Sequence, residues 1–288
     1  MMDKYLKPFD NFFQIFPSPY YNFFHKQTSA IMKANIAKFL NRLTTFKLSH
    51  ITPGLKTITY KQAIHLSHVI KTDIPIWPND PPVEFENVAE LDKDGYYLRR
   101  FSIGEHSATH INAPNSFHPG SIGIDQYSAE SLIIPAIVIN ISNKVIDNYD
   151  YILSINDLKD WEKLYGKIPK DSIVLISTGW ENKWEDKQAF FNIDKLGEMH
   201  FPGIGKDATE FLLQHRHIAG IGIDTHGIDA AQDKTFISNY LVLEKPRIVL
   251  ENLTNLSQLP PKGTTLIIGI LRLENGSGSP VGVIALVS

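Results

Sequence analysis

The stretch HSATHINAPNSFH, residues 106–118, holds three of the eleven histidines in this chain of 288 residues. His106 and His110 are four residues apart, a spacing that lets two side chains share a ligand on a helix but separates them by about 13 Å on a strand. Gly104 before the stretch and Pro114 within it argue against a regular helix. We therefore expect the two histidines to share a ligand only if the chain bends sharply between them.

The composition is that of a folded globular protein, and it narrows the chemistry. Hydrophobic residues make up 43% and charged residues 20%, with a formal net charge of −3, so no basic surface for nucleic acid is implied. The chain has no cysteine, so a metal would have to rely on His, Asp, Glu, Asn or backbone oxygen. No apolar stretch is long enough for a membrane span, and the N-terminus lacks a secretory pattern. We expect a cytoplasmic protein.

Residues 1–57 differ from the rest of the chain in their sequence pattern. We predict that they form an extension to a single domain, residues 58–288. Residues 8–24 are rich in aromatics and interrupted by two prolines, which argues against a continuous helix. Residues 28–48 carry apolar side chains at helical spacing with Lys and Arg between them, which predicts an amphipathic helix. That helix could pack on the protein's own core or on a second subunit, or lie on an anionic membrane surface.

From about residue 58 the sequence alternates between short β-rich runs and helical patterns, which predicts a mixed α/β domain. Two helices are predicted, one over 154–166 that begins at Ser154 and ends at Gly166, and one over 205–216. Seven runs are apolar enough to be strands buried on both faces. They are AIHLSHVI (63–70), AIVINIS (136–142), SIVLIST (172–178), IAGIGID (218–224), RIVLENL (247–253), TLIIGILRL (265–273) and GVIALVS (282–288).

The histidine stretch resembles the His-x-Gly-Thr-His-x-Asp-x-Pro-x-His signature of the cyclase family of metal-dependent hydrolases, which includes bacterial kynurenine formamidases and isatin hydrolases. Four further stretches resemble segments of that family in the expected order, so the resemblance covers roughly residues 60–288. They lie at 65–86, 171–184, 200–229 and 239–260. The resemblance implies an α/β fold with a mixed β-barrel-like sheet and flanking helices, of the swivelling β/β/α type. It also implies a homodimer or homotetramer and a site for one or two metals.

Six positions of the family's site map onto this chain, and three of them are occupied by other residue types. His106 and His110 fall on the first two metal-binding histidines, and Glu251 falls on a glutamate ligand. The three altered positions are Asn112 in place of a bridging aspartate, Asn239 in place of a second-metal histidine, and Ser116 in place of the catalytic histidine.

These replacements weaken the expected metal centre. An amide at Asn112 offers one neutral oxygen where a carboxylate offers two anionic ones, and Asn239 is a weaker ligand than imidazole. We therefore predict at most one divalent ion, zinc or manganese, or none. His106 and His110 would bind it, assisted by Glu251 or Asn112.

The proton-transfer group is also altered, because the hydroxyl of Ser116 does not accept a proton near pH 7. His118 in the same loop and His226 are candidate substitutes, as are His200 and Glu105. His118 could equally be a solvent-facing loop histidine.

Two further residues have two interpretations each. Trp77, on a proline-rich loop, is a candidate for stacking on a planar substrate, or it packs against the N-terminal helix. Asp224, at the end of an apolar run, could orient a histidine or cap the end of a strand.

Two functions from different classes follow. The first is metal-assisted hydrolysis of a small-molecule amide, like an arylformamidase acting on a carbon–nitrogen bond, or of a lactone or cyclic amide. The second is a metal-free relative that binds a small molecule or carries out a different reaction with other residues.

Overall fold

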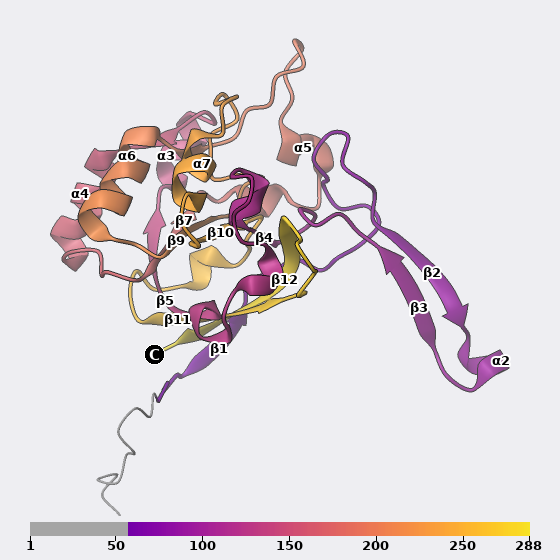
Figure 1. Cartoon of the computed structure of the whole chain (residues 1–288). Helices are drawn as coiled ribbons and strands as arrows, with labels where there is room; N and C mark the ends of the chain where they lie inside the picture. The colour runs from indigo at the N-terminus through magenta and orange to yellow at the C-terminus, as the bar shows by residue number, and fades with distance from the viewer. Residues whose placement is uncertain (1–56) are drawn as a thin grey trace, which may run out of the picture. The chain divides into compact units, whose positions relative to one another are not determined.

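The structure, a computed structural model, describes residues 57–288 (Figure 1). Residues 58–288 form one compact unit. The aromatic-rich segment and the amphipathic helix predicted for the N-terminal extension lie outside the described residues. Within the described part, no helix combines the length and the apolar character that crossing a membrane requires.

Seven strands close into a barrel, because β12 pairs with β11 on one side and with β4 on the other. An eighth strand, β1 (Gln62–His65), adds antiparallel to β12 outside the ring. In order around the ring the strands are β12 (Gly278–Val287), β11 (Thr264–Ile270), β5 (Ile133–Asn140), β7 (Ile173–Ser177), β9 (Gly220–Ile223), β10 (Ile248–Glu251) and β4 (His110–Asn112). This confirms the predicted mixed barrel, and all seven apolar runs contribute strands to this sheet.

Strands β5, β7, β9 and β10 run parallel, so each is joined to the next by a crossover that carries helices. These crossover helices flank the barrel on one side (Figure 1). They are α3 (Ser142–Asp147), α4 (Ile155–Tyr165), α5 (Lys187–Phe191), α6 (Lys206–Phe211) and α7 (Ile237–Leu243). Short helical turns complete the domain: η1 (Pro114–Ser116), η2 (Ile124–Gln126), η3 (Ala129–Leu132), η4 (Trp180–Lys183), η5 (Leu212–Arg216) and η6 (Leu256–Gln258).

The parallel strands of the barrel wall are apolar on both faces because each face packs on a different core. Two-sided burial was wrongly predicted for β1 and β11, in which one face stays largely exposed. In β5, Ala136 and Val138 belong to the cluster inside the barrel. Ile137 and Ile139 belong to the cluster beneath the helices, together with Trp161 of α4. This explains the uninterrupted apolar runs seen in the sequence.

The two predicted helices form close to their expected ends. The backbone N–H of Ser154 donates to the carboxylate of Asp157 at 2.7 Å, which fixes the start of α4, and Gly166 follows its last residue. Helix α6 ends at Phe211 and continues as the wider turn η5. Both predictions are confirmed.

Four further strands and a short helix lie outside the barrel. β2 (Glu84–Ala89) and β3 (Leu98–Ser102) form a hairpin that projects from the body, with α2 (Leu91–Asp94) at its tip (Figure 1). β6 (Ile152–Leu153) and β8 (Gly203–Ile204) make a small parallel pair. None of these was predicted, because their sequences lack the apolar runs of the barrel strands.

Candidate active site

A cavity of about 300 Å³ lies beside β4 and β10, on the face of the barrel that carries the helices. Its lining includes every predicted metal and substrate residue, but of the proton-transfer candidates it includes only Ser116 and His226, and not His118, His200 or Glu105. These lining residues are Trp77, His106, His110, Asn112, Ser116, His226, Asn239 and Glu251. Residues from one end of the domain to the other therefore meet in one pocket, as the resemblance implied.

The chain does bend sharply between the two histidines of the motif. Ala108 has a φ of 56°, in the left-handed region, and the ring centres of His106 and His110 are 5.4 Å apart. Asn252 holds the bend, because its amide donates to the carbonyl oxygen of Ala108 at 2.9 Å and its own carbonyl accepts from Oγ1 of Thr109 at 2.6 Å. The bend that a shared ligand would require is therefore present.

His110 and Glu251 are cross-strand neighbours, since β4 and β10 pair with these two residues in register. Nδ1 of His110 lies 3.0 Å from the carbonyl oxygen of Ala108, which can only accept, so Nδ1 carries a proton. Nε2 then faces Oε2 of Glu251 at 3.0 Å. Two lone pairs at this distance would repel each other, so a proton or a metal ion lies between Nε2 and Oε2. Burial alone would raise the pKa of Glu251, but hydrogen bonds from His110 and other neighbours hold it below its usual range.

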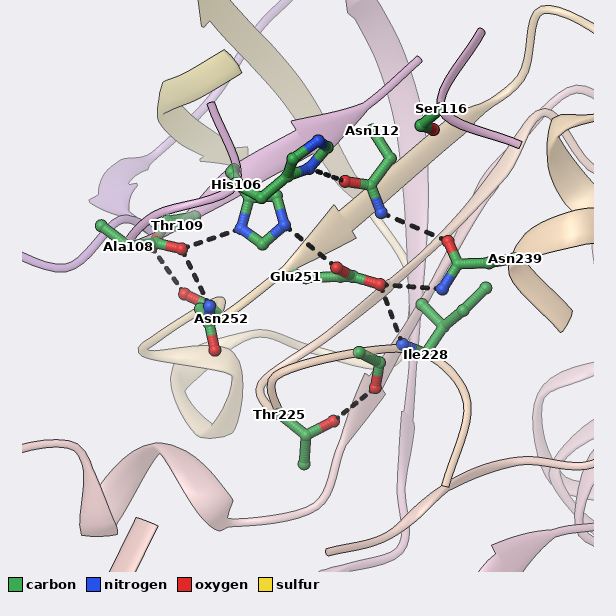
Figure 2. A network of polar contacts seen from close by, with 12 residues as sticks. His106, Ala108, Thr109, Asn112, Ser116, Thr225, Ile228, Asn239, Glu251 and Asn252 are labelled. Atoms are coloured by element: carbon green, nitrogen blue, oxygen red, sulfur yellow. Dashed lines mark hydrogen bonds and ion pairs between the residues drawn. The ribbon is translucent and has the colours of Figure 1, made fainter. Parts of the chain in front are cut away.

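The two asparagines of the site form a chain of amides with a fixed direction (Figure 2). Nδ2 of Asn239 donates to Oε1 of Glu251 at 3.0 Å and to Oδ2 of Asp229 at 3.1 Å. Carboxylates only accept, so Oδ1 of Asn239 must face Nδ2 of Asn112, 3.2 Å away. Oδ1 of Asn112 is thereby turned to Nδ1 of His106, at 2.8 Å. The two carboxylates thus dictate that Nδ1 of His106 carries a proton.

Both ring nitrogens of His106 are engaged by the protein. Nε2 lies 2.9 Å from Oγ of Ser277, whose hydroxyl and backbone N–H both contact Oε2 of Glu105, at 2.6 and 2.8 Å. Gly278 makes room for the ring, because a Cβ there would lie 2.7 Å from Cε1 of His106. Burial, and then the neighbouring His110, lower the pKa of His106.

Comparison with known proteins settles the family. Residues 64–230 match the family described as "Putative cyclase". The chain belongs to the cyclase family. It is 35% identical over 219 residues to the isatin hydrolase of Roseibium aggregatum, a match that covers 73% of this chain and 82% of that protein. It is 24% identical over 220 residues to a kynurenine formamidase of Bacillus thuringiensis, covering 76% of this chain and 94% of that protein.

A solved structure supports the same assignment. Isatin hydrolase A from Ralstonia solanacearum matches with a TM-score of 0.74 and 32% identity, over 79% of this chain and 92% of that one. The cyclase-family barrel predicted from the sequence is therefore confirmed.

The donor set of this cyclase-family site fits one ion at most and does not fit a two-metal centre. Across residues 57–288, no three or more His, Asp or Glu side chains form a ready-made metal site. His110 and Glu251 provide two strong donors aimed at each other. His106 could add a third only by giving up Asn112 or Ser277. The metal roles assigned to all five candidates stay predictions: His106, His110, Asn112, Asn239 and Glu251.

The candidates for proton transfer near the altered position are poorly placed. Ser116 lines the cavity, but its hydroxyl donates to the carbonyl of Ala113. His118 does not line the cavity; its Nε2 bonds to the carbonyl oxygen of Tyr240 at 2.8 Å. The role of His118 as a substitute base stays a prediction that this geometry does not support, because the imidazole contacts Tyr240 of α7 and does not line the pocket.

The other candidates have different surroundings. His226 lines the cavity, but burial lowers its pKa to about 3, so it is neutral and a weak proton acceptor near pH 7. His200 is bound to Asp150 at 2.7 Å and is absent from the cavity lining, and Glu105 is occupied by Ser277.

Trp77 and Asp224 have different surroundings, and the N-terminal helix that was the alternative contact of Trp77 lies outside the described residues. Trp77 lines the cavity, edge-on to His226, with ring centres 5.6 Å apart. Asp224 accepts from the backbone N–H groups of Thr178 and Gly179, which matches the strand-end cap and not an orienter of histidine.

Two residues of the site were missed by sequence reasoning. Asp229 lines the cavity and accepts from the backbone N–H groups of Ser238 and Asn239 at the start of α7, while burial raises its pKa. It stands at the end of the Gly-Ile-Asp-Thr-His-Gly-Ile-Asp stretch, five residues after Asp224, and this repeat was the one signal available. Ser277 carried no signal.

Proposed function

We propose that this chain hydrolyses the amide C–N bond of a small planar molecule, either a cyclic amide or an arylformamide. The observation that carries the proposal is the buried contact between His110 and Glu251 on the wall of the cavity. The relatives named isatin hydrolase and kynurenine formamidase support this proposal. Isatin is a cyclic amide and a formamide is an acyclic one, so both reactions break an amide bond. A lactone is a second possible substrate class, because its ring ester also presents a carbonyl group to attack by water.

The cavity has a polar side and an aromatic side. His110, Glu251 and Asp229 provide the polar side, and Trp77 and Phe201 provide aromatic surface. A volume of about 300 Å³ suits a molecule of one or two fused rings. The aromatic side would stack on the ring, which leaves the amide carbonyl to the polar side.

One zinc or manganese ion held by His110 and Glu251 would polarise the carbonyl and lower the pKa of water. The residues themselves prepare this contact. The carbonyl of Ala108 keeps the proton of His110 on Nδ1, so that Nε2 is directed at Glu251. The backbone N–H of Ile228 and the amide of Asn239 fix Oε1 of Glu251, which leaves Oε2 for His110. A proton between Nε2 of His110 and Oε2 of Glu251 makes the same contact when no ion is held.

The second candidate function is metal-free binding of a small molecule, and one observation favours it. Asn112 and Ser277 contact both nitrogens of His106, so neither ring nitrogen is free for an ion. In that case the pocket would bind the same planar molecules without turnover.

The test is to measure zinc and manganese in protein purified without chelator, and then hydrolysis of isatin and N-formylkynurenine with and without added ions. We expect at most one ion per chain and turnover that is lost in Glu251→Gln. The matched control is Glu185→Gln, which removes an exposed carboxylate bound to Lys71. An absence of turnover with either ion and either substrate would leave only the binding function.

A further inference from the structure

Among the buried polar side chains that line the cavity within residues 57–288, His226 is the one with a buried nitrogen that has no partner. Its side chain is 7% exposed, it lines the cavity, and Nε2 is fully buried with no hydrogen bond. The structure shows no hydrogen bond from Nδ1 to any described residue either. By contrast, His110, Asn239 and Glu251 on the same wall are all hydrogen-bonded. An unpaired buried imidazole is unfavourable unless something that enters the cavity bonds to it.

Aromatic rings hold this imidazole in place. Phe191 stacks on it at 4.9 Å with an interplanar angle of 16°, and Phe190 meets it edge-on at 4.7 Å. Trp77 and Phe201, at 5.6 and 6.3 Å, contact it and also line the cavity. Packed among these rings, the imidazole has no protein hydrogen-bond partner within the described part of the chain. Its aromatic neighbours provide a surface for a flat ligand.

Burial in this apolar surround keeps the imidazole neutral, with a pKa of about 3. A neutral imidazole has one nitrogen that donates and one that accepts. A cyclic amide carries an N–H next to its carbonyl. When the carbonyl lies at the contact of His110 and Glu251, the N–H is left for a hydrogen-bond acceptor on the aromatic side of the cavity.

We propose that His226 recognises the ring N–H of a planar bicyclic amide by accepting its hydrogen bond. The proposal rests on the proposed function, because the carbonyl end of the ligand is assigned to His110 and Glu251. It makes His226 a specificity-determining residue and replaces the role of base that the sequence suggested for it.

The experiment measures the affinity of the full-length protein for two ligands by calorimetry. The first is oxindole, a planar bicyclic amide, and the second is the indanone in which a CH₂ group replaces its N–H. We expect the wild type to bind oxindole about tenfold more tightly, the effect of one hydrogen bond. His226→Phe keeps an aromatic ring but removes both nitrogens, so the two affinities should become equal. His226→Gln, which retains an acceptor, should keep part of the difference and guards against a folding defect in the first variant.

The control variant is His68→Phe. His68 also has a buried Nε2 without a partner and stacks on an aromatic ring, that of Trp184 at 4.0 Å, but it does not line the cavity. We expect this variant to keep the preference of the wild type for oxindole.

Three results would overturn the proposal: no binding of either ligand, equal affinities in the wild type, or a preference that His226→Phe leaves unchanged. The last of these would assign His226 a packing role only. A preference for oxindole that depends on His226, without hydrolysis of any amide, would refute the proposed function and leave the recognition by His226 intact. Hydrolysis of isatin without a preference for oxindole would refute the recognition by His226 and leave the proposed function intact.

Discussion

Nδ2 of Asn239 lies 3.0 Å from Oε1 of Glu251, so an amide occupies the place where the family resemblance implies a metal-binding imidazole. The same nitrogen also donates to Asp229, at 3.1 Å. One neutral side chain therefore supplies a shared donor to two buried carboxylates. Two of the three altered positions, Asn112 and Asn239, therefore belong to one hydrogen-bond network, and we expect each to affect stability or ion binding.

Replacing Asn239 by Leu should destabilise the fold by about 2 kcal/mol, because two buried carboxylates lose their shared donor. Asn239→Asp should cost more near pH 7, since it adds a third carboxylate, and should recover stability as the pH falls and one of them takes a proton. Urea denaturation at pH 7 and pH 5 measures both. Asn182→Leu, at an exposed amide bonded to the carbonyl of Gly179, is the control. Equal losses at positions 182 and 239 would contradict the role of this network.

Asn112→Asp should raise the affinity for a divalent ion. Nδ2 of Asn112 now donates to Oδ1 of Asn239 at 3.2 Å. A carboxylate at position 112 has no proton to donate, so its oxygen and Oδ1 of Asn239 would repel each other unless a cation binds between them. Calorimetric titration with Zn²⁺ measures the change, and we expect at least about tenfold tighter binding.

Asn115→Asp adds the same charge outside the cavity and serves as the control for this titration. An equal gain in both variants would reduce the effect to long-range charge.

The fold was predictable from the sequence where burial is two-sided. The runs over 172–178 and 218–224 are apolar without interruption because β7 and β9 have a core on each face, and that pattern is visible in the sequence. Strand β4 was missed, because His110 and Asn112 face the cavity and only Ile111 enters the barrel core. A strand of three residues with two polar side chains has no such pattern.

The sequence predicted which residues lie in the site, but it did not predict the hydrogen bonds between them. The motif and the family order brought His106, Asn112 and Glu251 to one pocket correctly. The contact between His106 and Ser277 joins residues 171 positions apart, and no local pattern encodes it. The direction of the amides follows from which oxygen atoms surround them, and this requires coordinates. His118 lies two residues after Ser116, and that spacing gave no information on the turn that directs its side chain away from the pocket.

His226 should make the fold sensitive to acid. Its pKa is about 3 in the folded state and about 6.5 in the unfolded state. Between these two pH values the unfolded chain is protonated at His226 and the folded chain is not. Stability should therefore fall between pH 6.5 and pH 3, by up to about 1.4 kcal/mol per pH unit from this residue. Denaturation midpoints across this range should show a shallower decline in His226→Phe. The exposed His215, replaced by Gln, is the control, and a decline of wild-type steepness in His226→Phe would refute the assignment.

Asn252 should hold the bend of the motif through its amide and not only through its backbone. It has a φ of 55°, and its Nδ2 donates to the carbonyl of Ala108 at the centre of the bend. Asn252→Gly removes the amide at a position where glycine is unstrained, and should cost about 1 kcal/mol. Asn252→Ala removes the same amide and adds left-handed strain, so it should cost about 1 kcal/mol more. Urea denaturation of the two variants separates the contributions. A glycine variant as stable as the wild type would show that the amide is not what brings His106 and His110 together.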